Sequence, residues 1–197
     1  MKCLDSYTSK YVNNQGFTLV ELVAVMVILG ILAVYVAPRM FDKSDIAAYS
    51  VKNRAISIFR NMQVRAMQDT RSTSGFCYQV VVDSSNTQLG TPALDFSSSG
   101  SASDSCSSTI DTSDSGSFYY IPTTEFDEGN VTVSASNSEG ASLGAIRFNS
   151  KGQPIPITFD GSDAEVTGTC NSGCTLNFVG GDSATVCFES EGYIYAC

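Results

Sequence analysis

A polar segment opens the chain and is followed by a long apolar run. The run reads FTLVELVAVMVILGILAVYVA from Phe17 to Ala37, 21 residues in which Glu21 carries the only charge. At about 1.5 Å per residue, a helix of this length spans roughly 32 Å, close to the thickness of the hydrocarbon core of a bilayer. The run is longer than the apolar part of a secretory signal peptide and lacks a small-x-small cleavage site, so we expect a retained transmembrane helix.

A second helical segment follows, with apolar residues on one face. No Gly or Pro interrupts the chain between Phe41 and Ser74, and Gly75 is a natural stop. The apolar positions recur at separations of three, four or seven residues, and we expect them to pack on the rest of the chain: Ile46, Tyr49, Ile56, Phe59, Met62 and Ala66. Pro38 removes one backbone donor, so a helix kink is expected there, and Gly30 is a second weak point of the helix.

The remainder of the chain has the pattern of β-strands separated by turns. Strands are predicted within residues 76–83, 118–121, 130–136, 145–149 and 155–160. The clearest part is a C-terminal meander of CTLNFV, ATVCFES and YIYAC, joined by the turns GGDS and EG. Residues 97–117 contain 11 serines in 21 positions and are expected to form an exposed loop. The predicted fold is α+β: a long N-terminal helix, apolar in its first half and amphipathic in its second, packed on one face of an antiparallel sheet.

Seven cysteines suggest the compartment in which the chain folds. Cys3 precedes the apolar run, and six follow it: Cys77, Cys106, Cys170, Cys174, Cys187 and Cys197. An even set in a Ser/Thr-rich β region indicates disulfides formed outside the cytoplasm. The sequence leaves the connectivity open; the local pairing that we favour is Cys77 with Cys106, Cys170 with Cys174, and Cys187 with Cys197. The alternative is a zinc site made from the last four cysteines.

Charge divides the chain into two parts. From Arg39 to Arg71, seven basic residues stand against three acidic ones, whereas from Ser72 onward only Arg147 and Lys151 oppose 15 acidic residues. The basic part is either a solvated helix face or a surface that meets an acidic neighbour or an anionic membrane. The acidic part repels phosphate backbones, so nucleic-acid binding is not expected. Two acidic stretches within it, DSSNT and DTSDSG, are interpreted as solvated turns rather than calcium loops.

The composition argues against catalysis. Histidine is absent, which excludes Ser-His and Cys-His pairs and HExxH zinc sites. The sequence also has no GxSxG, Walker A or GxGxxG motif. We therefore expect neither an enzyme nor a bound cofactor or metal.

Glu21 is expected to have a partner, because a charged side chain in the bilayer costs about 2.5–3.5 kcal/mol; the alternative is a harmless carboxylate at the membrane edge. No basic residue lies between Phe17 and Ala37. If the leader ends at Gly16, Phe17 carries a positive α-amino group four residues before Glu21, on the same helix face. In a bundle of identical helices, the amine of one subunit can pair with Glu21 of its neighbour. Such a pair would fix the axial register between subunits, because a buried charge tolerates no misalignment.

The stretch GFTLVELVAVMVILGILAVYVAP, from Gly16 to Pro38, resembles the class III signal of type IV pilins and type II secretion pseudopilins. The resemblance implies cleavage by a prepilin peptidase between Gly16 and Phe17, N-methylation of Phe17, and a role of Glu21 in assembly. It also implies that the helix between Gly30 and Pro38 can loosen within a filament. The partners that it implies are other pilin subunits in a homo- or heteropolymer, the prepilin peptidase/N-methyltransferase, the pilus assembly platform and, before assembly, membrane lipid.

A weaker resemblance covers the C-terminal part, through FNSKGQPIPITF and ESEGYIYAC. These stretches are similar to minor pilins grouped with the H-type pseudopilin, and most like a minor subunit of the mannose-sensitive haemagglutinin (MSHA) pilus. In that group a β-sandwich head follows the helix. Some relatives bind DNA through basic residues, whereas here Arg147 and Lys151 stand among acids. The expected parts are a leader (1–16), a transmembrane and filament-core helix (17–37), an amphipathic helix (38–74) and a β-rich head (75–197).

We therefore expect a structural, minor subunit of a type IV pilus. It would be inserted in the bacterial inner membrane with its head in the periplasm, and then assembled into a surface filament for adhesion. A major pilin and a minor pseudopilin of a type II secretion system are alternatives, the latter to be discriminated by neighbouring genes. Another alternative is a membrane-anchored periplasmic binding domain that never polymerises. That protein would keep its leader and would be indifferent to Glu21→Ala.

Overall fold

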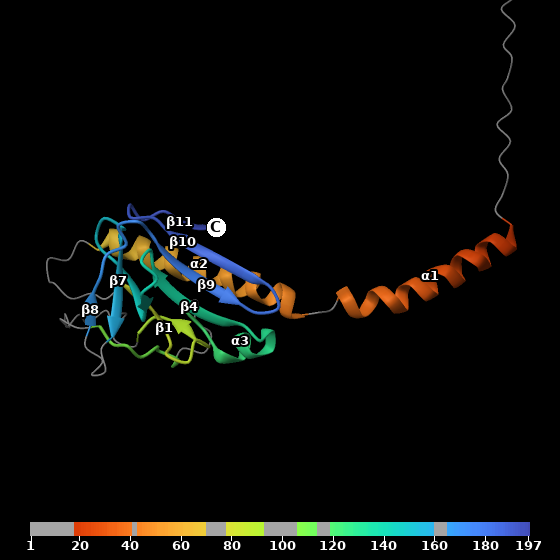
Figure 1. Cartoon of the computed structure of the whole chain (residues 1–197), viewed down its shortest axis with the longest axis horizontal. Helices are drawn as coiled ribbons and strands as arrows, with labels where there is room; N and C mark the ends of the chain where they lie inside the picture. Colours follow the sequence, from red (N-terminus) through yellow and green to blue (C-terminus); the bar gives the residue numbers. More distant parts are fainter. Residues whose placement is uncertain (1–17, 41–42, 70–77, 93–105, 114–118, 160–164) are drawn as a thin grey trace, which may run out of the picture. The chain divides into compact units, whose positions relative to one another are not determined.

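The fold was obtained as a computed structural model, which describes residues 18–40, 43–69, 78–92, 106–113, 119–159 and 165–197 (Figure 1). The chain divides into two compact units, Met1–Asp42 and Lys43–Cys197. The first unit contains helix α1 (Leu19–Met40), and the second, called the head below, contains all the other described elements. Each unit is described by itself.

Both helical segments that the sequence predicts are helices. α1 remains α-helical through Gly30 and Pro38 as far as Met40. The kink expected at Pro38 stays a prediction. α2 (Lys43–Gln68) opens the head and ends before the predicted stop at Gly75, which lies outside the described residues.

The rest of the head forms two antiparallel sheets and one short helix, α3 (Thr123–Gly129). The six-stranded sheet has the order β3-β2-β1-β6-β7-β8, with β3 Tyr120–Ile121, β2 Leu89–Gly90, β1 Gln79–Val82, β6 Ala145–Phe148, β7 Pro154–Phe159 and β8 Glu165–Thr167. The five-stranded sheet has the order β11-β10-β9-β4-β5, with β11 Ile194–Ala196, β10 Ser183–Phe188, β9 Cys174–Val179, β4 Thr132–Asn137 and β5 Ser142–Leu143. The predicted α+β class with antiparallel strands is confirmed.

Every segment predicted as a strand overlaps one, and the C-terminal meander follows its side-chain alternation. In β9 and β10, buried and more accessible residues alternate along the strands. The register pairs Cys174 with Phe188 and Val179 with Ser183. Strands β2, β5 and β8 and helix α3, of two to seven residues, were not predicted.

Helix α2 contacts strands of both sheets, rather than one sheet face as the sequence predicted. Its Phe59 ring lies edge-on to Phe148 of β6, at 6.4 Å between ring centroids, and to Phe188 of β10, at 4.8 Å. All three side chains are buried. The main core is therefore a single cluster in which α2 joins the two sheets.

The apolar stripe predicted for α2 is wrong at its N-terminal end. Ile46 is 67% exposed and Tyr49 is 42% exposed. At 3.6 residues per turn, Ile46 lies about 140° around the helix from Phe59, whereas Ala48 lies within about 20° of it. The buried face of α2 consists of Ala48, Val51, Ala55, Ile58, Phe59, Met62 and Ala66. Its alanines allow the helix backbone to come close to its neighbours.

The Ser-rich segment 97–117 is not simply an exposed loop. In its described part, 106–113, Ile110 is buried in a second apolar cluster together with Val81, Tyr120, Ala145 and Ile157. The segment is tied to the end of β2 by the backbone bond from Asp111 N to Thr91 O, at 2.8 Å. Gly90 makes room for it, because a Cβ there would collide with Tyr120 and Ile110. This segment thus covers part of the six-stranded sheet.

Candidate functional site

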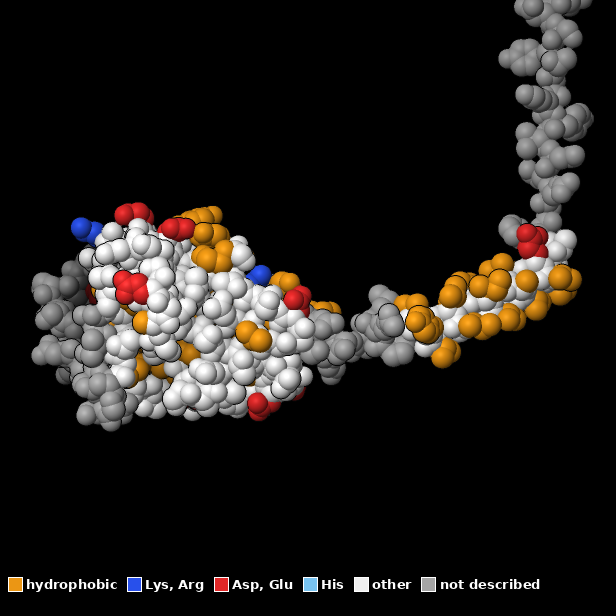
Figure 2. All heavy atoms as spheres, viewed as in Figure 1, with side chains coloured by type: hydrophobic (Ala, Val, Ile, Leu, Met, Phe, Trp, Pro, Cys, Tyr) orange, Lys and Arg blue, Asp and Glu red, His pale blue; other side chains and the backbone are white. Residues whose placement is uncertain are grey.

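The surface of α1 is the first candidate for function. Its large hydrophobic side chains are all at least 44% exposed, from Leu19 to Val36. The helical stretch Leu19–Val36 is long and apolar enough to cross a membrane, and none of it is buried. Figure 2 shows hydrophobic side chains along most of the visible face of α1, with an acidic side chain at its N-terminal end. A helix that is apolar on all sides needs lipid or other protein around it.

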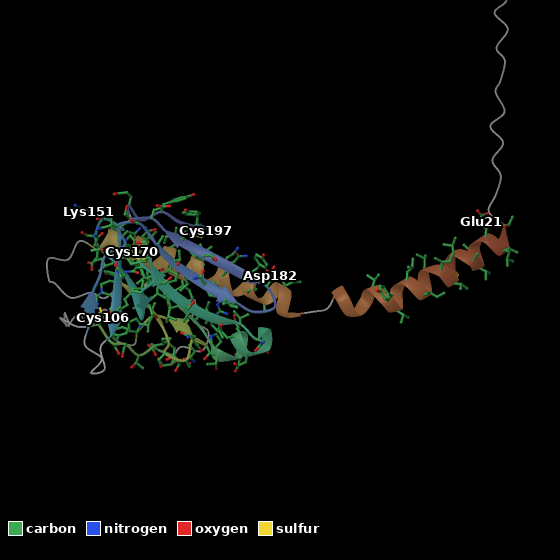
Figure 3. The ribbon with its side chains drawn as sticks, viewed as in Figure 1. Glu21, Cys106, Lys151, Cys170, Asp182 and Cys197 are labelled. Carbon is green, nitrogen blue, oxygen red and sulfur yellow. A yellow bond between two sulfur atoms is a disulfide. The ribbon has the colours of Figure 1, made fainter. Side chains whose placement is uncertain are left out.

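The first turn of α1 is held by a cap that the sequence analysis did not use. The Thr18 hydroxyl accepts a hydrogen bond from the Glu21 backbone N–H at 3.3 Å, and the Thr18 carbonyl accepts one from Leu22 N at 3.2 Å. Thr18 is therefore an N-cap, and Glu21 occupies the third position of the helix. The signal was present as a Thr-x-x-Glu capping box. The exposed carboxylate of Glu21 lies in the first helical turn (Figure 3), where the helix dipole favours negative charge.

Gly16 and Phe17, the predicted cleavage and methylation positions, lie outside the described residues, whereas Gly30 and Pro38 belong to α1. Within the described part of the chain, a Cβ added at Gly30 would meet nothing within 4 Å. The described packing of the first unit therefore does not require this glycine. A glycine in a helix costs about 1 kcal/mol relative to alanine.

The described arginines of α2 bind within the head. Arg54 pairs with Glu125 of α3 and donates to the Tyr120 carbonyl at 3.0 Å. Arg60 donates to the Ile194 carbonyl at 2.9 Å. Arg65 donates to the hydroxyl of Tyr119 and lies 4.8 Å from the centre of its ring. These hydrogen bonds hold α2 against the head, while Arg60 remains exposed, so both interpretations of the basic segment, a solvated face and a surface for a partner, stay predictions.

The two basic residues of the acidic part also have local roles. Arg147 is half-buried, and its guanidinium donates to Gln79 Oε1 at 3.0 and 3.3 Å. Gln79 is fully buried and in turn donates to the Ser107 carbonyl at 3.3 Å. Lys151 is exposed in the turn between β6 and β7, and its backbone N–H donates to Asn149 Oδ1. The arrangement ties Arg147 to its own sheet, which does not favour a nucleic-acid surface.

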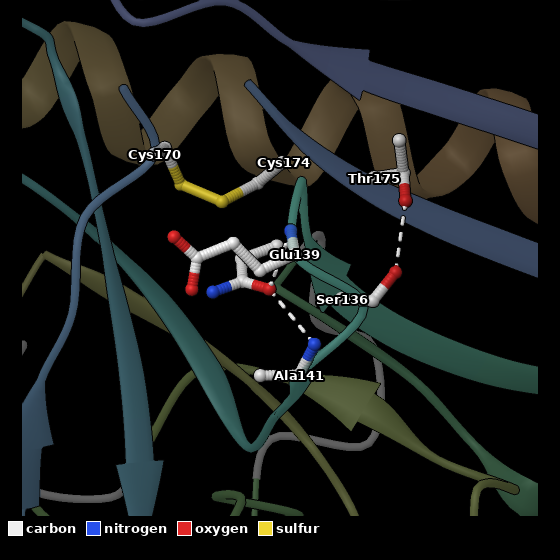
Figure 4. The surroundings of a disulfide bond; sticks show 7 residues. Ser136, Glu139, Ala141, Cys170, Cys174 and Thr175 are labelled. Atoms are coloured by element: carbon white, nitrogen blue, oxygen red, sulfur yellow. Dashed lines mark hydrogen bonds between the residues drawn. A yellow bond between two sulfur atoms is a disulfide. The ribbon is translucent and has the colours of Figure 1, made fainter. Parts of the chain in front are cut away.

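Two disulfides link cysteines in the C-terminal meander: Cys170 with Cys174 and Cys187 with Cys197. These are the local pairs favoured by the sequence. Cys106 is also disulfide-bonded, and its predicted partner, Cys77, lies outside the described residues. Close to the first pair, the hydroxyls of Ser136 and Thr175 lie 3.0 Å apart across β4 and β9 (Figure 4). The zinc site proposed as the alternative is wrong, because its four cysteines form these two disulfides and have no thiolate left to bind a metal.

The acidic turns form internal hydrogen bonds. The Asp83 carboxylate accepts from the N–H and hydroxyl of Ser85, and the Asp111 carboxylate accepts from Ser113 N at 2.9 Å. The bonds from Ser113 lower the pKa of Asp111. In the described parts of the chain, no group of three or more His, Cys, Asp or Glu side chains is placed to hold a metal ion.

Residues 12–37 match the family model for the prokaryotic N-terminal methylation motif. The matched stretch contains the described residues of α1 as far as Ala37, together with the capping pair Thr18 and Glu21. It carries a type IV pilin-like class III signal, which implies processing by a prepilin peptidase and assembly with other pilins. No curated protein and no solved structure matches the chain.

Proposed function

We propose that this chain is a subunit of a type IV pilus, cleaved between Gly16 and Phe17, N-methylated on Phe17 and polymerised through α1. The observation that carries the proposal is the coincidence of two features in one segment. Residues 12–37 carry the methylation motif, and α1 exposes an apolar surface that no described residue of its own unit covers. Before assembly lipid covers this surface, and in the filament neighbouring helices replace lipid at little hydrophobic cost.

Glu21 sets the register between subunits. After cleavage, Phe17 provides a positive amine directly before the Thr18 cap. The Thr18 hydroxyl satisfies the Glu21 backbone N–H. The Glu21 side chain is exposed, so its carboxylate can pair with the amine of a neighbour. Pairing also removes the cost of an isolated charge in the apolar bundle, about 2.5–3.5 kcal/mol in a bilayer. Gly30 and Pro38 serve as points at which the helix loosens during packing, which is consistent with the open space around Gly30.

The finer assignment is a minor subunit of an MSHA-type pilus with a role in adhesion. In this proposal, residues 1–16 form the leader, 17–37 the transmembrane and core helix, 38–74 the amphipathic helix and 75–197 the β-rich part of the head. The disulfides Cys170–Cys174 and Cys187–Cys197 support a head outside the cytoplasm, since thiols are kept reduced inside it. The inner membrane is the site of insertion, and the filament exposes the head at the cell surface.

The first test is the intact mass and N-terminal residue of the protein from its native membrane. We expect a chain that begins at Phe17, heavier by CH2 because a methyl group replaces one amine hydrogen, and lighter by two hydrogens for each disulfide. A chain that still begins at Met1 in cells with an active prepilin peptidase would remove the amine partner of Glu21. The anchored, non-polymerising binding domain would then become the better description.

The second test separates the charge of Glu21 from its size. Glu21→Gln preserves the shape of the side chain and removes its charge, whereas Glu21→Ala removes both. Both variants should be processed and folded but absent from filaments sheared from cells. Thr18→Ser, which preserves the capping hydroxyl, is the matched control and should assemble. Normal incorporation of Glu21→Gln would contradict the register role.

Comparing surface fibres with protein secretion in a strain that lacks this chain distinguishes a pilus from a secretion pseudopilus. A pilus subunit should alter fibres and attachment while extracellular enzymes are still released. The opposite result would assign the same N-terminal machinery to a secretion system.

A further inference from the structure

Three large side chains are exposed around the end of the head at which α2 begins. They are Ile46, Tyr49 and Val179, at 67%, 42% and 52% exposure, and we call them the Tyr49 patch. The Tyr49 hydroxyl donates to Asp182 Oδ2 at 3.0 Å. Asp182 lies in the β9–β10 turn, three residues after Val179, and this turn lies beside the start of α2 (Figures 1 and 3). Ile46 and Tyr49 belong to α2, whereas Val179 ends β9, about 130 positions further along the chain and on the strand face opposite the buried Phe178.

The chemistry of the patch fits the interface between water and lipid. Ile46 and Val179 present aliphatic side chains without a polar atom. Tyr49 presents an apolar ring while its hydroxyl remains bonded, and the Lys52 ammonium lies 5.0 Å from the ring centre. Tyrosine is enriched at membrane interfaces for this combination of an apolar body and a polar tip. Lysine can cover apolar surface with its stem and keep its charge in water.

Covalent geometry brings the patch within reach of a bilayer. Ile46 follows Met40, the last residue of α1, by six positions. If α1 spans the membrane, this short connection limits how far Ile46 can lie from the bilayer. At no more than about 3.6 Å per residue, Ile46 lies within roughly 22 Å of the end of α1, whatever the arrangement of the two units. Connectivity constrains Ile46 directly, but it does not require Val179 of β9 to face lipid. Val179 is therefore the residue that tests the orientation of the head.

We propose that the Tyr49 patch docks the head on the surface of the bilayer from which the subunit is later extracted. The inference rests on the membrane insertion of α1 in the proposed function. The partner is the zwitterionic interfacial region, because the carboxylates of Asp182 and the exposed Glu128 on neighbouring α3 disfavour an anionic surface. Docking orients the head before assembly and ends when α1 leaves the bilayer.

The absence of tryptophan from the chain allows a direct test with single-tryptophan variants. Ile46→Trp and Val179→Trp report on the patch. Val64→Trp and Tyr193→Trp are matched controls, since the native side chains are 48% and 66% exposed. Val64 lies 18 residues after Ile46 in the same helix, about 27 Å along its axis. The full-length chain would be reconstituted in phosphatidylcholine vesicles, with or without bromine on the acyl chains, and its fluorescence and flotation measured.

We expect brominated lipid to quench Val179→Trp and Ile46→Trp strongly and the two controls little. Quenching of Val179→Trp that is no stronger than that of the two controls, whatever the result for Ile46→Trp, would overturn the docking but leave membrane insertion intact if the protein floats with the vesicles. A Val179→Trp signal that changes with protein density and not with bromine would assign the patch to a second copy, which also overturns the proposal. Protein that fails to float would refute the membrane insertion itself, and this inference with it.

Discussion

Replacing Gly192 by alanine should destabilise the head far more than the same change at Gly140. Both glycines have positive φ, +97° at Gly192 and +81° at Gly140. A Cβ in this left-handed region costs about 1–2 kcal/mol. Around Gly140, the described residues place nothing within 4 Å of the new Cβ. At Gly192, the Cβ would collide with the Gly152 carbonyl oxygen and lie 2.8 Å from the Gln63 amide nitrogen.

The larger cost at Gly192 comes from the hydrogen bonds that meet there. The Gln63 side chain of α2 donates to the Gly152 carbonyl at 2.7 Å and to the Gly192 carbonyl at 2.5 Å. It thereby links one turn from each sheet to the helix. Loss of both bonds costs about 2 kcal/mol, at about 1 kcal/mol each. The free energy of unfolding should therefore fall by about 3–4 kcal/mol in Gly192→Ala and by about 1–2 kcal/mol in Gly140→Ala.

The assay is urea unfolding of the full-length chain in detergent micelles, with disulfides oxidised and near-ultraviolet circular dichroism as the signal. The same comparison in a Gln63→Ala background should shrink the excess cost of Gly192→Ala, since the bonds are already lost. Stabilities of Gly192→Ala and Gly140→Ala that agree within about 0.5 kcal/mol, the usual limit for independent sites, would refute the role of the Gln63 contacts.

Three further predictions concern other contacts of the head. Replacing both cysteines of Cys187–Cys197, which closes the longer loop, should lower the free energy of unfolding by about 2.7 kcal/mol from the loss of chain-entropy stabilisation. The same change at Cys170–Cys174 should lower it by about 1.9 kcal/mol. The reverse order in urea unfolding would contradict this prediction. Ile110→Ala should lower the free energy of unfolding by about 2–3 kcal/mol because the side chain is buried. Ile46→Ala, at an exposed position, should lower it little. Equal losses in the two variants would contradict the role of segment 106–113 in covering the sheet. The hydrogen bond to Glu189, followed by the charge of that carboxylate, raises the pKa of Tyr195, so the associated stability is present below about pH 10 and is lost as pH rises through the folded-state pKa. Glu189→Gln should therefore lower the pKa of Tyr195 in a spectroscopic titration and leave that of Tyr49 unchanged, because the pKa of Tyr49 is raised by Asp182 instead.

Local patterns in the sequence determined the parts of the protein that depend on near neighbours. The composition of α1 predicts a helix that lies in lipid or in a bundle, because a helix with apolar groups on all sides is unfavourable in water. Alternation and turn residues predict the meander of β9, β10 and β11, since strand pairing there joins adjacent segments. Short separations between cysteines favour Cys170–Cys174 and Cys187–Cys197 for the same reason. The motif at Thr18 and Glu21 also lies within one helical turn.

Only the tertiary structure decided contacts between residues far apart in the chain. Separations of three, four and seven residues fit more than one face of α2, and the two sheets select the face of Ala48 and Phe59 while leaving Ile46 exposed. The register of β1 against β6 brings Arg147 to Gln79, and the two turns beside α2 give Gln63 its acceptors. Ile110 finds its buried site in a segment whose composition alone favours exposure. Such choices depend on long-range packing and on the partners available to buried polar groups, which no local pattern of residues contains.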